Sequence, residues 1–372
     1  MNDFVPPGPL QGLKVVHLAS LGPGPYAAML LADMGCDVVI VDRTVPTANS
    51  VPPARDPRRR GQRSVALDLK DPQDFAALLK LVGRADVLIE GMRPGVAERL
   101  GLGPDQCLGL NPRLIYARMT GWGQEGSLSP RAGHDINYIA LSGALEAMGE
   151  KEGVPPVPLN LLGDYAGGGM YLVVGILAAL MERQKSGLGQ VVDGAIADGV
   201  ASLCATTFGI LATGGWKARG TNVFDGSTPW YAVYRTKDGR FVAVGAIEQP
   251  FYEQLLAGVG LNPAEWHRDD AARVARLKGE LESRFLAQDR AYWEMQFADT
   301  DACVSPVLSF TESLTHPYHQ SRGTYTVVGD VSQPAPGPRL SRTPFPPPGP
   351  PPERGEHTDE IRRELRQADS KD

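Results

Sequence analysis

Three side chains of this 372-residue chain have the types and settings of acid/base groups: His134, Asp164 and Glu248. His134 stands in the segment AGHDINY, a glycine-led turn that predicts the start of a helix, with Asp135 beside it. The first N–H groups of a helix lack intrahelical partners and carry the positive end of its dipole, so they can stabilise an oxyanion that develops nearby. A lone histidine is more often structural, but this setting favours proton transfer.

The two carboxylates have structural alternatives. Asp164 precedes a long apolar run, where an aspartate commonly caps a helix N-terminus. Three glycines, Gly167 to Gly169, follow one turn later, and each costs a helix about 0.8–1.0 kcal/mol relative to alanine. That cost leads us to expect a substrate or another backbone close to this turn. Glu248 lies just beyond a predicted hairpin and could simply cap the helix after Pro250.

The first glycine loop matches a dinucleotide-binding fingerprint in its spacing. Residues 22–27 (GPGPYA) follow a predicted strand and open a helix, and Asp42 ends the next strand, where a ribose-binding acid would lie. Pro23 and Pro25, however, lack the backbone N–H groups that would cradle a pyrophosphate, and Arg43 puts a cation beside the acid. We therefore favour a glycine turn needed for tight strand-to-helix packing over nicotinamide or flavin binding.

Cationic side chains follow several predicted strands. Arg43, Lys70 and Arg93 each stand after a strand, and open α/β sheets bind ligands beyond the carboxyl ends of their strands. Charged donors there suit a ligand with several phosphates. Composition alone also allows a solvated loop for the arginines that precede the third strand, Arg55, Arg58, Arg59, Arg60 and Arg63.

These residues need a scaffold, and hydrophobic periodicity predicts one. Helical segments alternate with short apolar strands, expected at residues 13–18, 37–41, 64–69, 85–90, 114–119 and 190–195. The alternation predicts an α/β fold, with a doubly wound, mostly parallel, Rossmann-like sheet in a large domain over residues 1–200.

A second, smaller α+β domain is expected over residues 225–325. Two alternating runs flank the turn signal Lys237-Asp238-Gly239, and helical segments follow them. Residues 201–224 are expected to be a linker. Residues 330–372, a proline-rich strap and a short helix, are expected to complete the large domain.

Composition limits the class of protein. A formal net charge of -6 disfavours nucleic-acid binding. The four cysteines form no C-x-x-C pair, which predicts neither a disulfide framework nor a zinc site and suits the cytoplasm. The amino terminus shows no secretory signal. The uncharged stretch 165–181 is short for a membrane span and contains four glycines, so we expect a buried helix and no membrane partner.

Taken in order, these segments resemble the α-methylacyl-CoA racemases of the family III CoA-transferase (CaiB/BaiF-type) superfamily. The resemblance covers nearly the whole chain and rests on segments such as LASLGPGPYAAMLLADMGCDVVIVDR, RGQRSVALDLKD, ADVLIEGMRPG, GQVVDGAI and WYAVYRTKDGRFVAVGAIE. AGHDINY followed by LNLLGDYAGGG is typical of the racemase branch. The resemblance implies the family fold and an interlocked homodimer, with each active site between one subunit's large domain and the other's small domain.

The resemblance also assigns site residues. His134 and Asp164 match the two catalytic positions, and Glu248 matches the carboxylate that partners the histidine from the other subunit. The Asp135 backbone N–H is expected to help hold an enolate oxygen. The matching coenzyme A contacts are Arg43, Leu67, Asp68, Leu69, Lys70, Gly133, Ile136, Asn137 and Tyr138, with Arg93 in a matching loop.

The chemistry implied is an isomerisation of an acyl-CoA substrate. One base removes the α-proton and the other returns a proton to the opposite face, which interconverts (R)- and (S)-2-methylacyl-CoA through an enolate. The reaction requires no metal and no cofactor beyond the CoA moiety, and fatty acid metabolism is the expected setting. Two alternatives stay open: a CoA-transferase that forms an acyl anhydride on Asp164, and a non-catalytic acyl-CoA-binding protein.

Overall fold

The computed structural model describes residues 8–45 and 51–369 and contains two compact units. The first unit comprises the described parts of Met1–Ser142, Pro158–Cys204 and Gln320–Asp372. The second comprises Gly143–Val157 and Ala205–His319.

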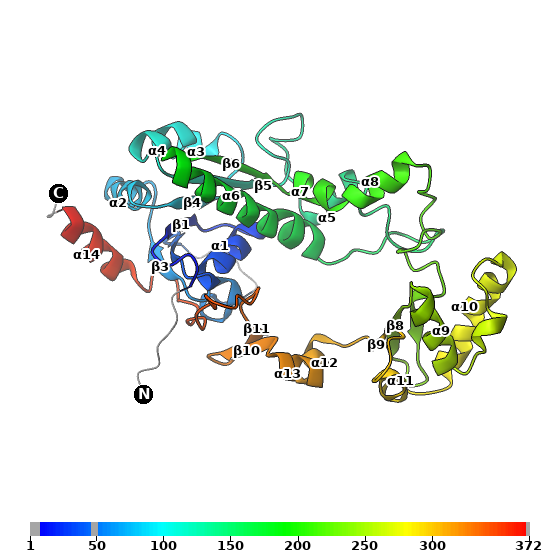
Figure 1. Ribbon diagram of the computed structural model, residues 1–372. Coiled ribbons are helices and arrows are strands. Elements are labelled where there is room, and N and C mark those ends of the chain that lie inside the picture. Colours follow the sequence, from blue (N-terminus) through cyan, green and yellow to red (C-terminus); the bar gives the residue numbers. More distant parts are fainter. Residues whose placement is uncertain (1–7, 46–50, 370–372) are drawn as a thin grey trace. The chain divides into compact units, whose positions relative to one another are not determined.

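The first unit is built on a six-stranded parallel sheet with the strand order β3-β2-β1-β4-β5-β6 (Figure 1). The predicted doubly wound, Rossmann-like fold is therefore confirmed. The strand order reverses between β1 and β4, and ligands of such sheets bind beyond the carboxyl ends of the strands at this point. The strands are β1 (Lys14–Leu18), β2 (Asp37–Asp42), β3 (Arg63–Ala66), β4 (Val87–Glu90), β5 (Ile115–Thr120) and β6 (Gln190–Ala195).

Helices cover both faces of this sheet (Figure 1). One face is covered by α1 (Pro23–Asp33) and α6 (Tyr171–Ser186). The other is covered by α2 (Pro72–Gly83), α4 (Pro104–Leu110) and α14 (Thr358–Asp369). Successive side chains of a strand point to opposite faces of the sheet, and here both faces pack against apolar side chains of helices. The strands are therefore continuous apolar runs in the sequence.

The longest helical segment begins as a ten-residue π-helix, Leu161–Met170, and continues as α6. Asp164 lies inside this segment, so the suggestion that it is an N-cap is wrong. A Cβ on Gly167 would lie 2.9 Å from the Val200 backbone nitrogen, and one on Gly169 would lie 2.9 Å from the Pro23 carbonyl oxygen. The expected close approach of another backbone is confirmed, and the neighbours are α7 (Ile196–Leu203) and α1.

Within the described residues, one helix, Leu161–Ser186, is long and apolar enough by length and composition to cross a membrane. Leu172, Ile176 and Leu180 are buried. On the same helix, however, Val174 is 62% exposed and Met181 is 61% exposed. The predicted burial therefore holds for one side of the helix only.

The second unit contains a three-stranded antiparallel sheet, made of β7 (Tyr231–Arg235), β8 (Phe241–Gly245) and β9 (Val304–Pro306). Its core of Tyr234, Leu255, Phe285 and neighbouring side chains is closed by three helices, α9 (Gln249–Gly258), α10 (Ala271–Leu286) and α11 (Arg290–Phe297). The hairpin predicted around residues 237–239 is present as the β7–β8 pair.

The units do not begin and end where the sequence pattern suggested. Residues 205–212 form helix α8 and belong to the second unit, so the stretch expected to be a linker is partly helical. Gly143–Val157 also belongs to the second unit, because the Arg219 guanidinium donates to the carbonyl oxygens of Glu150 and Gly153. Hydrogen bonds across some seventy residues leave no local pattern in a sequence.

The C-terminal part of the chain packs on the first unit. After α12 (Phe310–Thr315) and α13 (Pro317–Arg322), β10 (Tyr325–Val328) and β11 (Val331–Pro334) form a hairpin. Residues 335–357 then run without helix or strand to α14. There the Thr358 hydroxyl oxygen accepts a hydrogen bond from the Ala66 N–H at 3.0 Å.

Candidate active site

The candidate acid/base residues of the first unit lie on helix starts that pack against one another. α1 follows β1 directly, and the π-helix packs against α1 and against α5 (Asp135–Leu141). His134 is the residue that precedes α5, and Asp164 is in the first turn of the π-helix. Tertiary packing thus joins two segments that are thirty residues apart in sequence.

Gly22 gives the Asp164 carboxylate its room. Gly22 is the N-cap of α1 and has a φ of +66°, a conformation that side chains rarely adopt. A Cβ at this position would lie 3.1 Å from Asp164 Oδ2. The first glycine loop therefore faces a carboxylate, which repels the phosphates that a dinucleotide fingerprint would bind.

Asp42, the residue in the place of a ribose-binding acid, is occupied by protein groups. Its carboxylate accepts hydrogen bonds from both terminal nitrogens of Arg59, the shorter at 2.6 Å, and from the Ser64 hydroxyl at 2.6 Å. It is also buried. These contacts support the packing interpretation of the glycine loop over dinucleotide binding.

His134 is exposed and caps α5 with its backbone. Its N–H donates to Asn137 Oδ1 at 3.0 Å, which fixes the backbone at the start of the helix. Its imidazole is exposed, so it is open to a ligand.

Asp164 is half-buried and held from two sides. Its backbone N–H donates to Asp135 Oδ2 at 2.6 Å, and its own Oδ2 accepts from Asn160 Nδ2 at 3.2 Å. Burial raises the pKa of the Asp164 carboxyl group and Asp135 raises it further, against the hydrogen bond from Asn160 and the charges of His134 and Arg58. The net direction is upward, so this carboxyl group holds its proton more tightly than an exposed aspartate.

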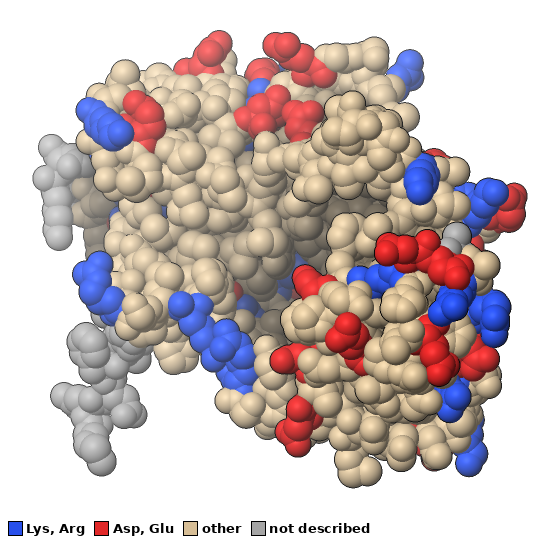
Figure 2. Space-filling model, turned by 45° about the vertical axis from the view of Figure 1, so that its right-hand side comes forward, with Lys and Arg blue, Asp and Glu red and all other residues tan. Residues whose placement is uncertain are grey.

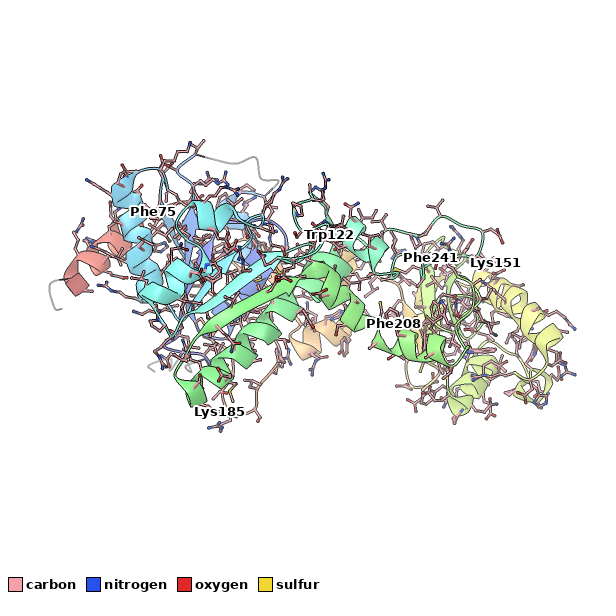
Figure 3. The ribbon with its side chains drawn as sticks, turned by 90° about the horizontal axis from the view of Figure 1, so that it is seen from above. Phe75, Trp122, Lys151, Lys185, Phe208 and Phe241 are labelled. Atoms are coloured by element: carbon pink, nitrogen blue, oxygen red, sulfur yellow. The ribbon has the colours of Figure 1, made fainter. Side chains whose placement is uncertain are left out.

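Tyr138 fills the space behind these residues. Its ring is buried and meets Trp122 edge to face, with 4.7 Å between ring centroids (Trp122 is labelled in Figure 3). A Cβ on Gly121 would lie 2.0 Å from the Tyr138 ring. Burial raises the pKa of Tyr138, and the Asp164 charge adds to the effect. Its side chain is therefore part of the packing, and a contact from Tyr138 to coenzyme A would have to use its backbone.

Sequence reasoning missed three neighbours of Asp164: Gly22, Asn160 and Arg58. Asn160 stands four residues before Asp164, at helical spacing, and this is a signal that could have found it. Gly22 and Arg58 carried none, because each lies more than a hundred residues away in the chain.

The other predicted contacts lie at the carboxyl ends of β2, β3 and β4. Arg43, Lys70 and Arg93 are exposed there and have no ion pair within the described part of the chain. Leu67 is only 2% exposed and belongs to the core, so only its backbone could contact a ligand. Of the remaining expected contacts, Asp68, Ile136 and Asn137 are exposed, and Leu69 and Gly133 are half-buried.

The arginines before β3 form ion pairs within the protein instead of a free cationic edge. Arg60 is almost fully buried and binds the Asp33 carboxylate in a bidentate pair, with a shorter distance of 2.6 Å. Arg58, Arg59 and Arg63 are likewise paired with Asp56, Asp42 and Asp37. The suggestion of a solvated loop is therefore wrong for most of them.

Glu248 lies in the second unit, exposed, as the N-cap of α9. Its carboxylate accepts no capping hydrogen bond from the N–H groups of the helix. The preceding carbonyl oxygens of Ala246 and Ile247 accept hydrogen bonds from Arg268, which stacks on Tyr252. The pairing of Glu248 with His134 stays a prediction.

Among residues 8–45 and 51–369, no group of three or more His, Cys, Asp or Glu side chains is arranged to hold a metal ion. The donors that do converge, His134 and Asp164, suit proton transfer in type and environment.

Comparison with known proteins agrees with this geometry. Residues 10–358 match the model of the family described as CoA-transferase family III. The chain is 45% identical over 360 residues to "Alpha-methylacyl-CoA racemase" of Mus musculus and 46% identical over 367 residues to that of Homo sapiens. Each match covers 96% of this chain and 93% of the relative. A CAIB/BAIF family protein from Brucella suis has a similar structure, with a TM-score of 0.85 at 26% identity over 96% of this chain and all of that one.

Proposed function

The chain belongs to CoA-transferase family III, and on that premise we propose that it is a racemase that interconverts (R)- and (S)-2-methylacyl-CoA thioesters. It is an isomerase by its similarity to the racemases over nearly its whole length. The observation that carries the proposal is the convergence of an exposed imidazole, His134, and a half-buried carboxyl group, Asp164, on helix starts that pack together.

Binding of the coenzyme A moiety is assigned to the carboxyl ends of the strands. Arg43, Lys70 and Arg93 would contact its phosphate groups, since all three are exposed beyond the carboxyl ends of β2, β3 and β4. The backbones of Leu67 and of residues 133–138 would position the rest of the carrier. These contacts leave the thioester directed toward His134 and Asp164.

Proton transfer then requires one base on each face of the α-carbon. We assign His134 to one face, with Glu248 as its carboxylate partner, and Asp164 to the other. The raised pKa of Asp164 suits a group that must both give and take a proton in the two directions of the reaction. Each direction uses one residue as the base and the other as the acid.

The enolate oxygen is assigned to the Asp135 N–H. Asp135 is the first residue of α5, where N–H groups have no intrahelical acceptor. A donor fixed at the place where negative charge develops lowers the barrier most. The reaction therefore uses side chains and a backbone amide of the protein, with no cofactor beyond the CoA moiety.

We also propose that the protein works as a homodimer in the cytoplasm, with a role in fatty acid metabolism. The four cysteines are free, which suits a reducing compartment. Apolar side chains on α6 and α8, such as Val174, Met181 and Phe208, are exposed in the single chain (Phe208 is labelled in Figure 3). In Figure 2, broad areas of one face carry no Lys, Arg, Asp or Glu. A second copy would cover such surfaces, and would supply Glu248 to His134 across the interface.

Deuterium uptake from heavy water tests the racemase. One enantiomer of a 2-methylacyl-CoA should gain deuterium at its α-carbon while the other enantiomer appears, without any second carboxylic acid. Asp164→Asn and His134→Asn should each lower the racemisation rate by about a hundred- to ten-thousandfold. NMR and chiral chromatography measure the two events separately.

The alternatives give different results in the same experiment. Transfer of CoA onto an added carboxylic acid, with no deuterium uptake over a panel of branched acyl-CoAs, would establish the transferase. Binding of acyl-CoA with neither activity would establish a non-catalytic binding protein.

A further inference from the structure

We propose that the Asp135 side chain is a positioning residue that holds Asp164 opposite His134, acting through the Asp164 backbone. The inference rests on the racemase function proposed above, in which Asp135 contributes only its backbone N–H. Its side chain performs a separate task, which follows from its contacts.

Asp135 connects the two segments that carry the bases. Its backbone immediately follows His134, and its Oδ2 accepts the Asp164 N–H at 2.6 Å across 29 residues of sequence. Asp135 is only 6% exposed, so water does not compete freely for this hydrogen bond. One side chain thus ties the start of α5 to the turn that holds the second base.

The chain around this hydrogen bond is shaped to admit the carboxylate. Gly163 is buried, and a Cβ on it would lie 2.5 Å from Asp135 Oδ2. Any other residue at 163 would push the carboxylate away from the neighbouring Asp164 N–H. That N–H is in the first turn of a π-helix, where intrahelical acceptors are missing, so Asp135 supplies the acceptor from outside.

The charge of Asp135 also acts on the second base. Within the described residues no cation pairs with it, and its Oδ1 is buried without a hydrogen-bond partner. Its negative charge is therefore not neutralised locally and adds to the effect of burial in raising the pKa of Asp164. Position and charge can be separated experimentally, because asparagine keeps the acceptor oxygen but loses the charge.

Two substitutions test the proposal: Asp135→Ala, which removes the acceptor, and Asp135→Asn, which keeps it. Asp135→Ala should lower the racemisation kcat by about ten- to a hundredfold, because a base displaced by an ångström reacts slowly. One enantiomer, the one whose α-proton faces His134, should still take up deuterium without racemising. Asp135→Asn should racemise at a rate within about threefold of wild type. In the direction that uses Asp164 as the base, the acid limb of the pH–rate profile should move to lower pH, because the charge that helps to raise the Asp164 pKa is gone.

Amide hydrogen exchange gives a readout that does not depend on activity. The segment 161–164 should exchange faster in Asp135→Ala than in wild type, and at the wild-type rate in Asp135→Asn. Asp270→Ala is the matched control: Asp270 accepts the Ala272 N–H at 3.0 Å at the start of α10 in the second unit, so its loss should leave both site readouts unchanged.

The possible failures are distinct. The positioning role would be overturned if Asp135→Ala lost racemisation and deuterium uptake to the same extent. It would also be overturned if the amide exchange of segment 161–164 were unchanged in this variant. An active Asp135→Ala variant would overturn it as well. Absence of deuterium uptake by the wild-type protein would instead overturn the racemase function. The amide-exchange result would still show whether the Asp135 side chain holds the segment that contains Asp164.

Discussion

Burial and four neighbouring groups act on the Asp164 carboxyl group in opposite senses. Burial raises its pKa, as does the charge of Asp135. The hydrogen bond from Asn160 and the charges of His134 and Arg58 lower it. None of these groups is unusual alone. Their net effect is an upward shift of the Asp164 pKa, so this carboxyl group takes up a proton more readily than an exposed aspartate, which suits a reversible proton transfer.

His17 shows the cost of burying a titratable residue that the proposed mechanism does not use. It is 2% exposed on β1, and Nε2 lies 3.2 Å from the Ser20 hydroxyl oxygen. Burial lowers the pKa of His17 to about 4; the Asp42 charge raises it and the Arg59 charge lowers it, each by less than burial does. The fold therefore favours the neutral imidazole, and the stability that depends on it is present above pH 6.5 and lost as the pH falls toward 4.

We expect the free energy of unfolding of the first unit to fall by about 2 kcal/mol between pH 7 and pH 4.5 because of His17 alone. His17→Gln should lack this part of the pH dependence. Denaturant titrations at the two pH values measure it. The exposed His267→Gln variant is the control and should keep the wild-type slope. An identical pH dependence in His17→Gln and wild type would contradict the prediction.

At the scale of elements, the π-helix is positioned by close backbone contacts. α7 crosses it at Gly199, where a Cβ would lie 1.8 Å from the Gly167 carbonyl oxygen. α1 meets it at Gly169. Glycine is unfavourable inside a helix, and its repeated use here is explained by these two crossings. The crossings set the position of the turn that carries Asp164.

Gly199→Ala should therefore force α7 and the π-helix apart. We expect a loss of about 1–3 kcal/mol in stability, as for other overpacked sites, and a fall in racemisation kcat that exceeds the change in KM. Thermal unfolding and steady-state kinetics measure the two effects. Gly279→Ala is the matched control, because Gly279 lies in α10 with nothing within 4 Å of an added Cβ. A Gly199→Ala variant as stable and active as wild type would show that the crossing does not position the site.

At the scale of the whole molecule, two features of the single chain point to a second copy. Apolar side chains are exposed on its surface, and one proposed catalytic residue belongs to a different unit from the other two. Val174 and Met181 are more than half exposed on α6, and Phe208 is 54% exposed on α8. Glu248 belongs to the second unit, whereas His134 and Asp164 belong to the first. A homodimer that places the second unit of one copy against the first unit of the other would account for both features.

Sedimentation should then give a particle of twice the chain mass of 39.9 kDa. Val174→Lys should shift it toward the single-chain mass, because a charge would replace an apolar contact.

Co-expression of His134→Asn and Glu248→Gln chains should restore activity that neither variant has alone, since one of the two sites in the mixed dimer would be intact. A single-chain particle with full activity would contradict the assembly, and binding to lipid vesicles would show that a membrane covers the surface instead.

The sequence by itself determined the parallel sheet, the hairpin of the second unit and the two residues most suited to proton transfer. Strands of a parallel sheet are buried on both faces and so read as apolar runs bounded by turns, a local pattern that survives without a structure. His134 was recognisable because a glycine-led helix start and an acidic neighbour are adjacent in sequence. The three glycines after Asp164 predicted a close backbone approach for the same reason.

Only the tertiary structure decided what these features contact. Gly22, in the loop that matches a dinucleotide fingerprint, leaves room for the Asp164 carboxylate. The Asp42 carboxylate accepts hydrogen bonds from Arg59, and the Asp135 carboxylate accepts one from the Asp164 N–H. The unit boundaries moved because Arg219 binds carbonyl groups some seventy residues away. Each of these contacts joins segments far apart in the chain, where neither periodicity nor spacing carries information. Their energies come from burial and direct hydrogen bonding, which exist only once the chain has folded.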